Sequence, residues 1–151
     1  MKLTTKFYGE IEIEEDQIIN FPQGLPGFEE QRRFVYLKPE DSLFGSLQAV
    51  DLPELGFVVI SPFIVCPDYH FDLDDQMAKD LGLSKLEEVL LLSIVTIPQG
   101  QPKDATVNLQ APIVINTVNQ RGAQVILAEM GYPLRCRIWA EESTEAAVTK
   151  D

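Results

Sequence analysis

The chain has 151 residues, with 24 acidic and 12 basic side chains and a formal net charge of −12 at pH 7. Hydrophobic residues make up 45% of it, which suits a folded domain with its own core. A chain this acidic repels phosphate backbones, so the charge argues against direct nucleic-acid binding and favours solubility or a basic protein partner.

The first residues, Met1 to Lys6, lack the apolar stretch of a secretion signal. The longest apolar run, residues 89–92, is far shorter than the ~20 residues that cross a bilayer. We therefore expect a cytoplasmic protein with no membrane partner. In that compartment Cys66 and Cys136 are expected to be free thiols rather than a disulfide.

A small β-meander is expected over residues 3–21, because Glu and Ile alternate strictly over residues 10–14. The next segment, residues 21–30, holds two prolines and two glycines, which predicts a fixed loop. Within it, Leu25-Pro26-Gly27-Phe28 fits a type II turn with Gly27 at positive φ. The loop carries Phe21, Leu25 and Phe28, which either plug the core or form a contact surface.

Further strands are expected at residues 33–38, 43–50, 57–60 and 89–97, the last apolar enough for a central position. The two prolines of residues 61–69 predict an irregular segment or a sheet edge. One helix is indicated by Leu73, Met77 and Leu81, which recur every four residues. Asp72 or Asp74 can cap its start and Gly82 its end, and a second helical turn is expected at residues 84–87.

Residues 106–127 are expected to organise the fold, with strands at 106–109, 113–118 and 124–127. A hairpin turn is predicted at residues 119–122, with Gly122 at positive φ. Residues 113–115, Ile-Val-Ile, are apolar on both strand faces, so both faces must be covered. The sequence predicts an all-β, mainly antiparallel, small β-barrel-like domain with one or two short helices over residues 1–140. A last short strand is expected at 135–139 and a flexible tail at 141–151.

No catalytic, cofactor or metal site is expected. His70 is the single histidine, and Cys66-x-x-x-His70 lacks the second pair of ligands that a zinc site needs. Asp72, Asp74 and Asp75 lack the glycine and glutamate of a calcium loop, so helix capping is the better interpretation. No glycine-rich phosphate loop is present.

Two basic clusters stand out, Arg32-Arg33 and Arg135/Arg137, and nearby acids favour ion pairing for both. A non-enzymatic acidic protein-interaction domain is therefore favoured. Two alternatives remain: a carboxylate-dependent hydrolase, which would need paired acids in a cleft, and a direct RNA binder, which the charge disfavours.

Several segments, in order from roughly residue 7 to residue 127, match the signatures of one known family. Residues 21–28, FPQGLPGF, fit the signature F-x-x-G-L-P-G-F. Residues 106–116, TVNLQAPIVIN, followed by Gln124 to Leu127, are the most specific match. Shorter matches lie at residues 47–49 (with Ala for Ser), 55–59, 61–63 and 68–71. Together these segments resemble the FliW family of flagellar assembly factors.

The resemblance implies a non-enzymatic protein that binds newly made flagellin and the translational repressor CsrA, with no cofactor and no small-molecule substrate. When flagellin is scarce, the free protein would capture CsrA and flagellin mRNA would be translated. When flagellin accumulates, it would occupy the protein and release CsrA to repress. The net charge of −12 would also keep RNA away from captured CsrA.

Because flagellin's terminal segments are amphipathic when helical, helix-in-groove or strand-addition binding is expected. Partner contacts are expected on the proline-rich loop and at the rims of the 106–127 hairpin. For Asn108 and Asn116, hydrogen bonds to neighbouring turns are the alternative interpretation. The candidate contact residues are Phe21, Pro22, Leu25, Pro26, Phe28, Asn108 and Asn116.

Overall fold

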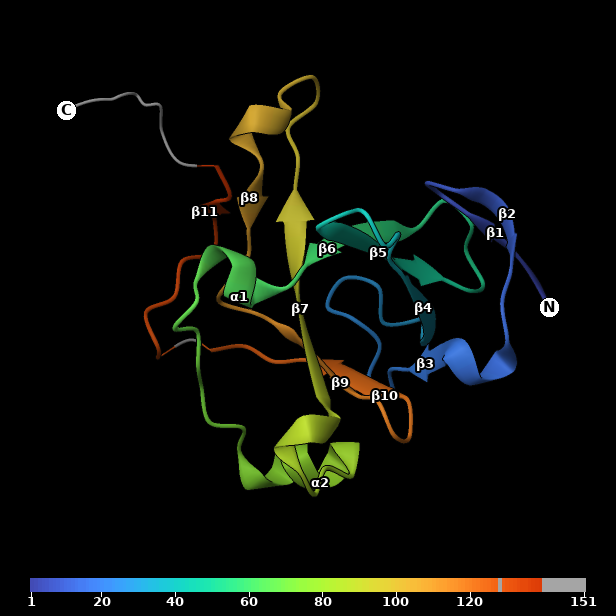
Figure 1. Cartoon of the computed structure of the whole chain (residues 1–151). Helices are drawn as coiled ribbons and strands as arrows, with labels where there is room; N and C mark the ends of the chain where they lie inside the picture. The colour runs from blue at the N-terminus through green and yellow to red at the C-terminus, as the bar shows by residue number, and fades with distance from the viewer. Residues whose placement is uncertain (128, 140–151) are drawn as a thin grey trace.

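The structure, a computed structural model, describes residues 1–127 and 129–139. Strand β7 (Val89–Thr96) pairs with β6 on one side and with β9 on the other (Figure 1). The pairing continues from β6 through β5, β4, β3 and β10 back to β9, so seven strands close into a barrel. The bounds of the other six are β6 (Gly56–Ile60), β5 (Phe44–Ala49), β4 (Arg33–Leu37), β3 (Ile18–Asn20), β10 (Arg121–Gln124) and β9 (Ile113–Asn116).

All strand pairs of the described chain are antiparallel except β3 with β10, where Asn20 lies beside Arg121 in a parallel pair. The predicted all-β, mainly antiparallel barrel is therefore confirmed. Beyond the ring, β8 (Thr106–Val107) pairs with β7, and β11 (Cys136–Arg137) pairs with β8. A separate hairpin joins β1 (Lys2–Thr5) to β2 (Gly9–Glu12). The predicted tail, residues 141–151, lies outside the described residues, as does residue 140.

The predicted helix is α2 (Asp75–Leu81), and both of its expected ends are confirmed. The Asp74 carboxylate accepts a hydrogen bond from the Met77 amide at 2.7 Å, and Gly82 ends the helix at φ 68°. The prediction for residues 61–69 was wrong in part, because α1 (Pro62–Val65) forms there. Proline is favourable at the first position of a helix, where its missing N–H would have no partner. Short 3₁₀ turns complete the set: η1 (Glu15–Gln17), η2 (Leu86–Glu88) and η3 (Pro102–Asp104).

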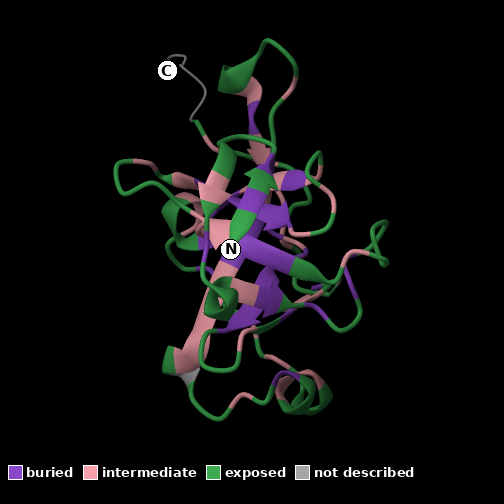
Figure 2. Ribbon diagram, turned by 90° about the vertical axis from the view of Figure 1, so that its right-hand side faces the viewer, coloured by how far each residue is buried: buried purple, intermediate pink, exposed green. Residues whose placement is uncertain are grey.

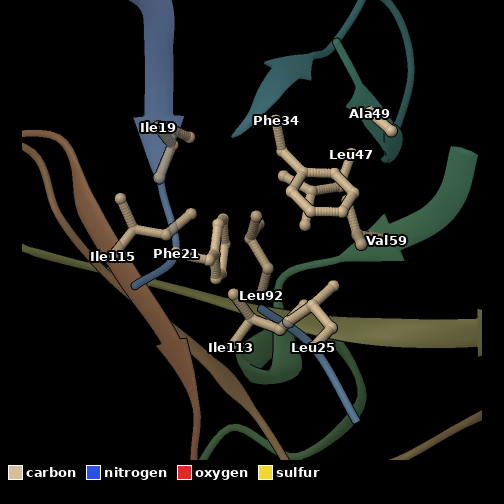
Figure 3. Close-up of a cluster of buried hydrophobic side chains, with 10 residues drawn as sticks. All are labelled: Ile19, Phe21, Leu25, Phe34, Leu47, Ala49, Val59, Leu92, Ile113 and Ile115. Atoms are coloured by element: carbon tan, nitrogen blue, oxygen red, sulfur yellow. The ribbon is translucent and has the colours of Figure 1, made fainter. Parts of the chain in front are cut away.

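The barrel interior is filled by apolar side chains from strands on all sides of the ring. Figure 3 shows Phe21 on the side of β9 and Phe34 on the side of Leu47 and Val59. Figure 2 shows the buried residues gathered in the strands while α2 stays mostly exposed. The buried residues of this cluster are Ile19, Phe21, Leu25, Phe34, Leu47, Ala49, Val59, Leu92, Ile113 and Ile115.

Strand β9 is covered on both faces, as predicted, since Ile113, Val114 and Ile115 are each at most 1% exposed. The predicted turn position was wrong. The turn occupies residues 117–120, and Gln120 rather than Gly122 takes positive φ, at 58°. Gly122 lies inside β10, where it makes room for the Phe21 ring.

Candidate partner-binding site

The proline-rich loop, residues 21–30, divides its side chains between the core and the surface. Phe21 and Leu25 are 0% and 1% exposed, and the Phe21 ring meets Phe34 edge-on at 5.3 Å. The Phe28 amide donates to the Leu25 carbonyl at 2.7 Å and Gly27 has φ 88°, which is the expected turn. Phe21 and Leu25 therefore plug the barrel, while Pro22, Pro26 and Phe28 are exposed.

Phe28 forms an aromatic contact at the surface beside β6. Its side chain is 40% exposed, and its ring meets Phe57 edge-on at 5.5 Å. Near the same end of β6, the exposed Phe7 ring lies against Gly56, where a Cβ atom would come within 3.3 Å of it. Two exposed aromatic rings thus flank the start of one barrel strand.

Gln48 holds the β1–β2 turn against the barrel, a role the sequence did not reveal beyond the family match at residues 47–49. The side chain is fully buried. Its Oε1 accepts from the Lys6 amide at 2.8 Å, and its Nε2 donates to the carbonyls of Ala49 and Pro53 at 3.0 and 3.1 Å. A third carbonyl, of Leu52, lies 3.4 Å away. The oxygen and the nitrogen of this buried amide therefore both have hydrogen-bond partners.

Asn108 and Asn116 both bond to neighbouring turns, as in the alternative interpretation of these residues. The Asn108 Oδ1 accepts from the amides of Gln110 and Ala111, each at 3.0 Å. The Asn116 Oδ1 accepts from the Val118 amide at 2.9 Å, which stabilises the turn after β9. Asn116 is only 1% exposed, so a partner could not reach it in this conformation.

A groove of about 640 Å³ lies between residues 69–85 and the outer faces of β7 and β9. In Figure 1 this segment runs from α1 to α2 alongside β7. Strand alternation explains the floor, because Leu92 points into the barrel core while Leu91 points outward. Apolar side chains dominate the lining, among them Phe63, Phe71, Leu73, Leu83, Leu91 and Val114.

Aromatic side chains fix one end of the groove. The Tyr69 ring packs against Tyr132 at 4.6 Å, against Phe71 at 5.9 Å and against Phe63 at 6.2 Å. The Tyr69 hydroxyl donates to the Leu109 carbonyl at 2.6 Å, and burial raises its pKa, so it stays protonated as a donor. The Tyr132 hydroxyl accepts from the His70 amide at 3.0 Å and donates to the His70 carbonyl at 2.8 Å.

Polar side chains in and beside the β9–β10 turn hold the C-terminus of α2 next to the groove. Asn116 Nδ2 and Asn119 Nδ2 both donate to the Leu81 carbonyl, at 2.8 and 3.0 Å. The Arg121 guanidinium donates to the Asp80 carbonyl at 3.1 Å. These donors satisfy carbonyls that a helix end leaves without partners, and a cation suits that end of the helix dipole.

The other ionisable side chains of the described residues include two free thiols and two arginine ion pairs. Within residues 1–127 and 129–139, no three His, Cys, Asp or Glu side chains are placed to hold a metal ion. Cys66 and Cys136 are free thiols, and burial raises the pKa of Cys136. The predicted ion pairing is confirmed for Arg33 with Asp51 at 2.7 Å and for Arg137 with Asp104 at 3.0 Å. No helix in the described part of the chain is long and apolar enough to cross a membrane.

Comparison with known proteins gives a consistent result. The family model of the FliW protein matches residues 2–138. The flagellar assembly factor FliW of Geobacillus thermodenitrificans (strain NG80-2) is 45% identical over 142 residues, which cover 94% of this chain and 98% of that protein. That of Bacillus subtilis (strain 168) is 40% identical over 142 residues, 93% and 99% of the two chains. A crystal structure of the flagellar assembly factor FliW superposes with a TM-score of 0.88 at 43% identity, covering 94% of this chain and 99% of that one.

Proposed function

The chain belongs to the FliW family of non-enzymatic flagellar assembly factors, and we propose that it binds both flagellin and the translational repressor CsrA. The observation that carries the proposal is the match in sequence and fold over 94% of the chain to flagellar assembly factors of similar length. Binding would be a protein–protein interaction without bond chemistry.

CsrA and flagellin would occupy the protein alternately, depending on the amount of free flagellin. With flagellin scarce, the free protein holds CsrA and flagellin mRNA is translated. With flagellin in excess, the protein is occupied and CsrA represses. The net charge of −12 supports this scheme, because a strongly negative partner beside CsrA raises the electrostatic cost of bringing RNA phosphates close.

On the proline-rich loop, the proposed contact residues are the exposed Pro22, Pro26 and Phe28. Phe21 and Leu25 would contribute indirectly, by holding the loop in one conformation through their burial in the core. A rigid loop loses little conformational entropy when a partner binds, which favours affinity.

The test uses the purified chain with flagellin monomers and CsrA from the same organism. Isothermal titration measures each affinity, and flagellin is then added to the preformed complex with CsrA. We expect both to bind and flagellin to release CsrA. If neither protein bound, the proposed function would be wrong.

Two sets of variants sharpen the test. Phe28→Ala is compared with Leu43→Ala, an exposed apolar residue outside the loop, and only the first should weaken binding. For the electrostatic part, the exposed Glu10 and Glu12 are changed to Gln, and RNA displacement from CsrA is measured at low and high salt. A variant that still bound CsrA and displaced RNA as well as the native chain at low salt would contradict the charge mechanism.

A further inference from the structure

We propose that the edge of β7 from Val89 to Leu91, on the side away from β9, binds an extended, uncharged segment of a partner protein as an added strand. The proposal goes beyond the proposed function, because it concerns how a partner's chain is held and does not depend on which protein supplies the segment. Three features support it: the pairing of β7, the direction of its backbone groups and the composition of this edge.

Strand β7 is paired along one edge but only in part along the other. On the first edge lie β9, opposite residues 89–92, and β8, opposite Val95 and Thr96. On the second edge β6 pairs only with Ser93 and Ile94. Among the described residues, no strand pairs with the second edge of β7 before Ser93.

A proline explains why β6 stops where it does. Ile60 lies opposite Ser93, so two further residues of β6 would place Pro62 opposite Leu91. Proline has no N–H to donate to the Leu91 carbonyl, and Pro62 begins α1 instead. The chain therefore leaves the sheet and the second edge of β7 continues without it.

The hydrogen bonds to β9 fix which backbone groups of β7 face the second edge. The Thr117 amide donates to the Glu88 carbonyl at 2.8 Å, so Glu88 faces β9. In an antiparallel ladder every second residue does the same, so Leu90 also faces β9. Leu91 then turns its N–H and C=O to the opposite edge, and Val89 turns its C=O there. An added antiparallel strand would lie in line with β6 and make one hydrogen bond to each of these groups.

This edge is apolar and uncharged. Val89, Leu90 and Leu91 are only half-buried, although Leu90 packs against the barrel core. Charged side chains on an edge strand discourage pairing with another chain. The strands of the β1–β2 hairpin and β11 carry such exposed charges, on Lys2, Glu10, Glu12 and Arg137. The edge at residues 89–91 lacks this protection, which suits it to pairing with another chain.

The same features select the occupant. A helix keeps its hydrogen bonds within its own backbone, whereas an extended segment can bond to the N–H and C=O of Leu91. Side chains of the added strand opposite Leu91 and Val89 would lie on the outer face of the sheet, beside the apolar lining of the groove, which favours apolar residues at alternate positions. A second copy of this chain is disfavoured, because each copy carries a net charge of −12.

The experiment uses the full chain and a designed eight-residue peptide in which valine alternates with threonine, labelled for fluorescence anisotropy. Two matched peptides carry a backbone N-methyl group on every valine or on every threonine. The chain variants are Leu91→Lys, which places a charge on the proposed edge, and Thr96→Lys as its control. Thr96 is exposed on the same strand but pairs with β8. The melting temperature of each variant shows whether it is folded.

We expect the unmodified peptide to bind with its valines opposite Leu91 and Val89. Methylated valines cannot donate to the carbonyls of these two residues, so that peptide should bind at least about tenfold more weakly. The threonine-methylated peptide should bind within about twofold of the unmodified one, because its methyl groups point away from β7. Leu91→Lys should weaken binding about tenfold, with Thr96→Lys unchanged.

Amide hydrogen exchange of the native chain locates the peptide, even if Leu91→Lys does not fold. Binding should slow exchange at the Leu91 amide by about tenfold or more and leave exchange at Leu90, whose amide already faces β9, unchanged. The proposal would be overturned if the unmodified peptide did not bind, if it bound without slowing exchange at Leu91, or if the two methylated peptides were weakened equally. A dimer of the chain that protects the Leu91 amide without peptide would overturn it as well.

The results separate this proposal from the proposed function. If the native chain bound flagellin or CsrA but the peptide did not bind, the strand-addition proposal would be wrong and the proposed function would stand. If the peptide bound at Leu91 but neither protein bound the chain, the proposed function would be wrong and the strand-addition proposal would stand.

Discussion

The ring of Phe21 lies against the backbone of Gly122, so closely that a Cβ atom at Gly122 would sit 2.7 Å from the ring's Cζ. Phe21 comes from the proline-rich loop and Gly122 from β10. Phe21 can therefore fill the barrel only because the residue opposite it in β10, about a hundred positions later in the sequence, is a glycine.

Gly122→Ala should lower the free energy of unfolding by about 1–3 kcal/mol, because the new methyl group overpacks the core at Phe21. Urea denaturation measures the loss. The double variant with Phe21→Leu is the control, since the smaller side chain relieves the clash and should recover part of the stability relative to Phe21→Leu alone. An alanine variant as stable as the native chain would show that the ring can move aside freely.

Leu25→Ala should cost about 2–5 kcal/mol of stability, because Leu25 is 1% exposed inside the barrel and its truncation leaves a cavity. Phe28→Ala should cost less than about 1.5 kcal/mol, the scale of one aromatic pair, because the ring is 40% exposed. Thermal and urea unfolding compare the two. Equal losses would contradict the division of the loop into plug and surface.

Gln48→Leu should destabilise the protein by about 1–3 kcal/mol, because the variant keeps the approximate volume but leaves the Lys6 amide and several carbonyls without their partner. Amide hydrogen exchange gives the sharper measurement. The Lys6 amide should exchange faster, while amides of β7 lose protection only by the global loss of stability. Unchanged exchange at Lys6 would show that another group holds the β1–β2 turn.

Asp51→Asn should remove a small, pH-dependent part of the stability. The Arg33 guanidinium, bonded to Asp51 at 2.7 and 3.2 Å, lowers the pKa of this carboxyl. An acid with a lowered pKa stabilises the fold above its unfolded-state pKa and loses that effect as pH falls through its folded-state pKa. Both side chains are about half exposed, so we expect roughly 0.2–1 kcal/mol at neutral pH. The free energies of unfolding of the native chain and the variant, measured by urea denaturation, should converge at acidic pH. A difference that stayed constant with pH would show that the ion pair is not its source.

Local patterns predicted the elements whose cause is local. Ile113 to Ile115 are apolar on both faces and are buried on both. Asp74 and Gly82 mark the ends of α2 because the capping hydrogen bond and the positive φ depend on those residues alone. The closure of β7 onto β9 was not predictable in the same way, since strand order depends on contacts between distant segments.

The turn after β9 shows how local reasoning can choose the wrong residue. Gly122 is the residue that takes positive φ at least cost, so sequence alone assigned it to the turn. Instead Gln120 takes that conformation within a turn whose amides bond to the Asn116 and Asn119 side chains. Gly122 leaves space for the Phe21 ring, and no local sequence pattern predicts this contact across the barrel.

The groove also escaped sequence reasoning. Its lining comes from separate segments between Phe63 and Val114, and no periodic pattern spans them. Nothing in the sequence of residues 68–71 indicates that Tyr69 and Phe71 form the aromatic end of the groove. Tyr69 and Phe71 form a groove wall only because the folded chain places β7 opposite them, and that contact is not encoded in their local sequence.

The parallel pair of Asn20 with Arg121 sets the order in which the ring can be completed. It joins a strand near the start of the chain to one made late in synthesis, and contacts this distant in sequence form slowly because loop-closure entropy opposes them. Until β10 leaves the ribosome, β3 has no partner on that side and Phe21 has no Gly122 to lie against. We therefore expect nascent chains that stop before β10 to leave this part of the barrel interior uncovered.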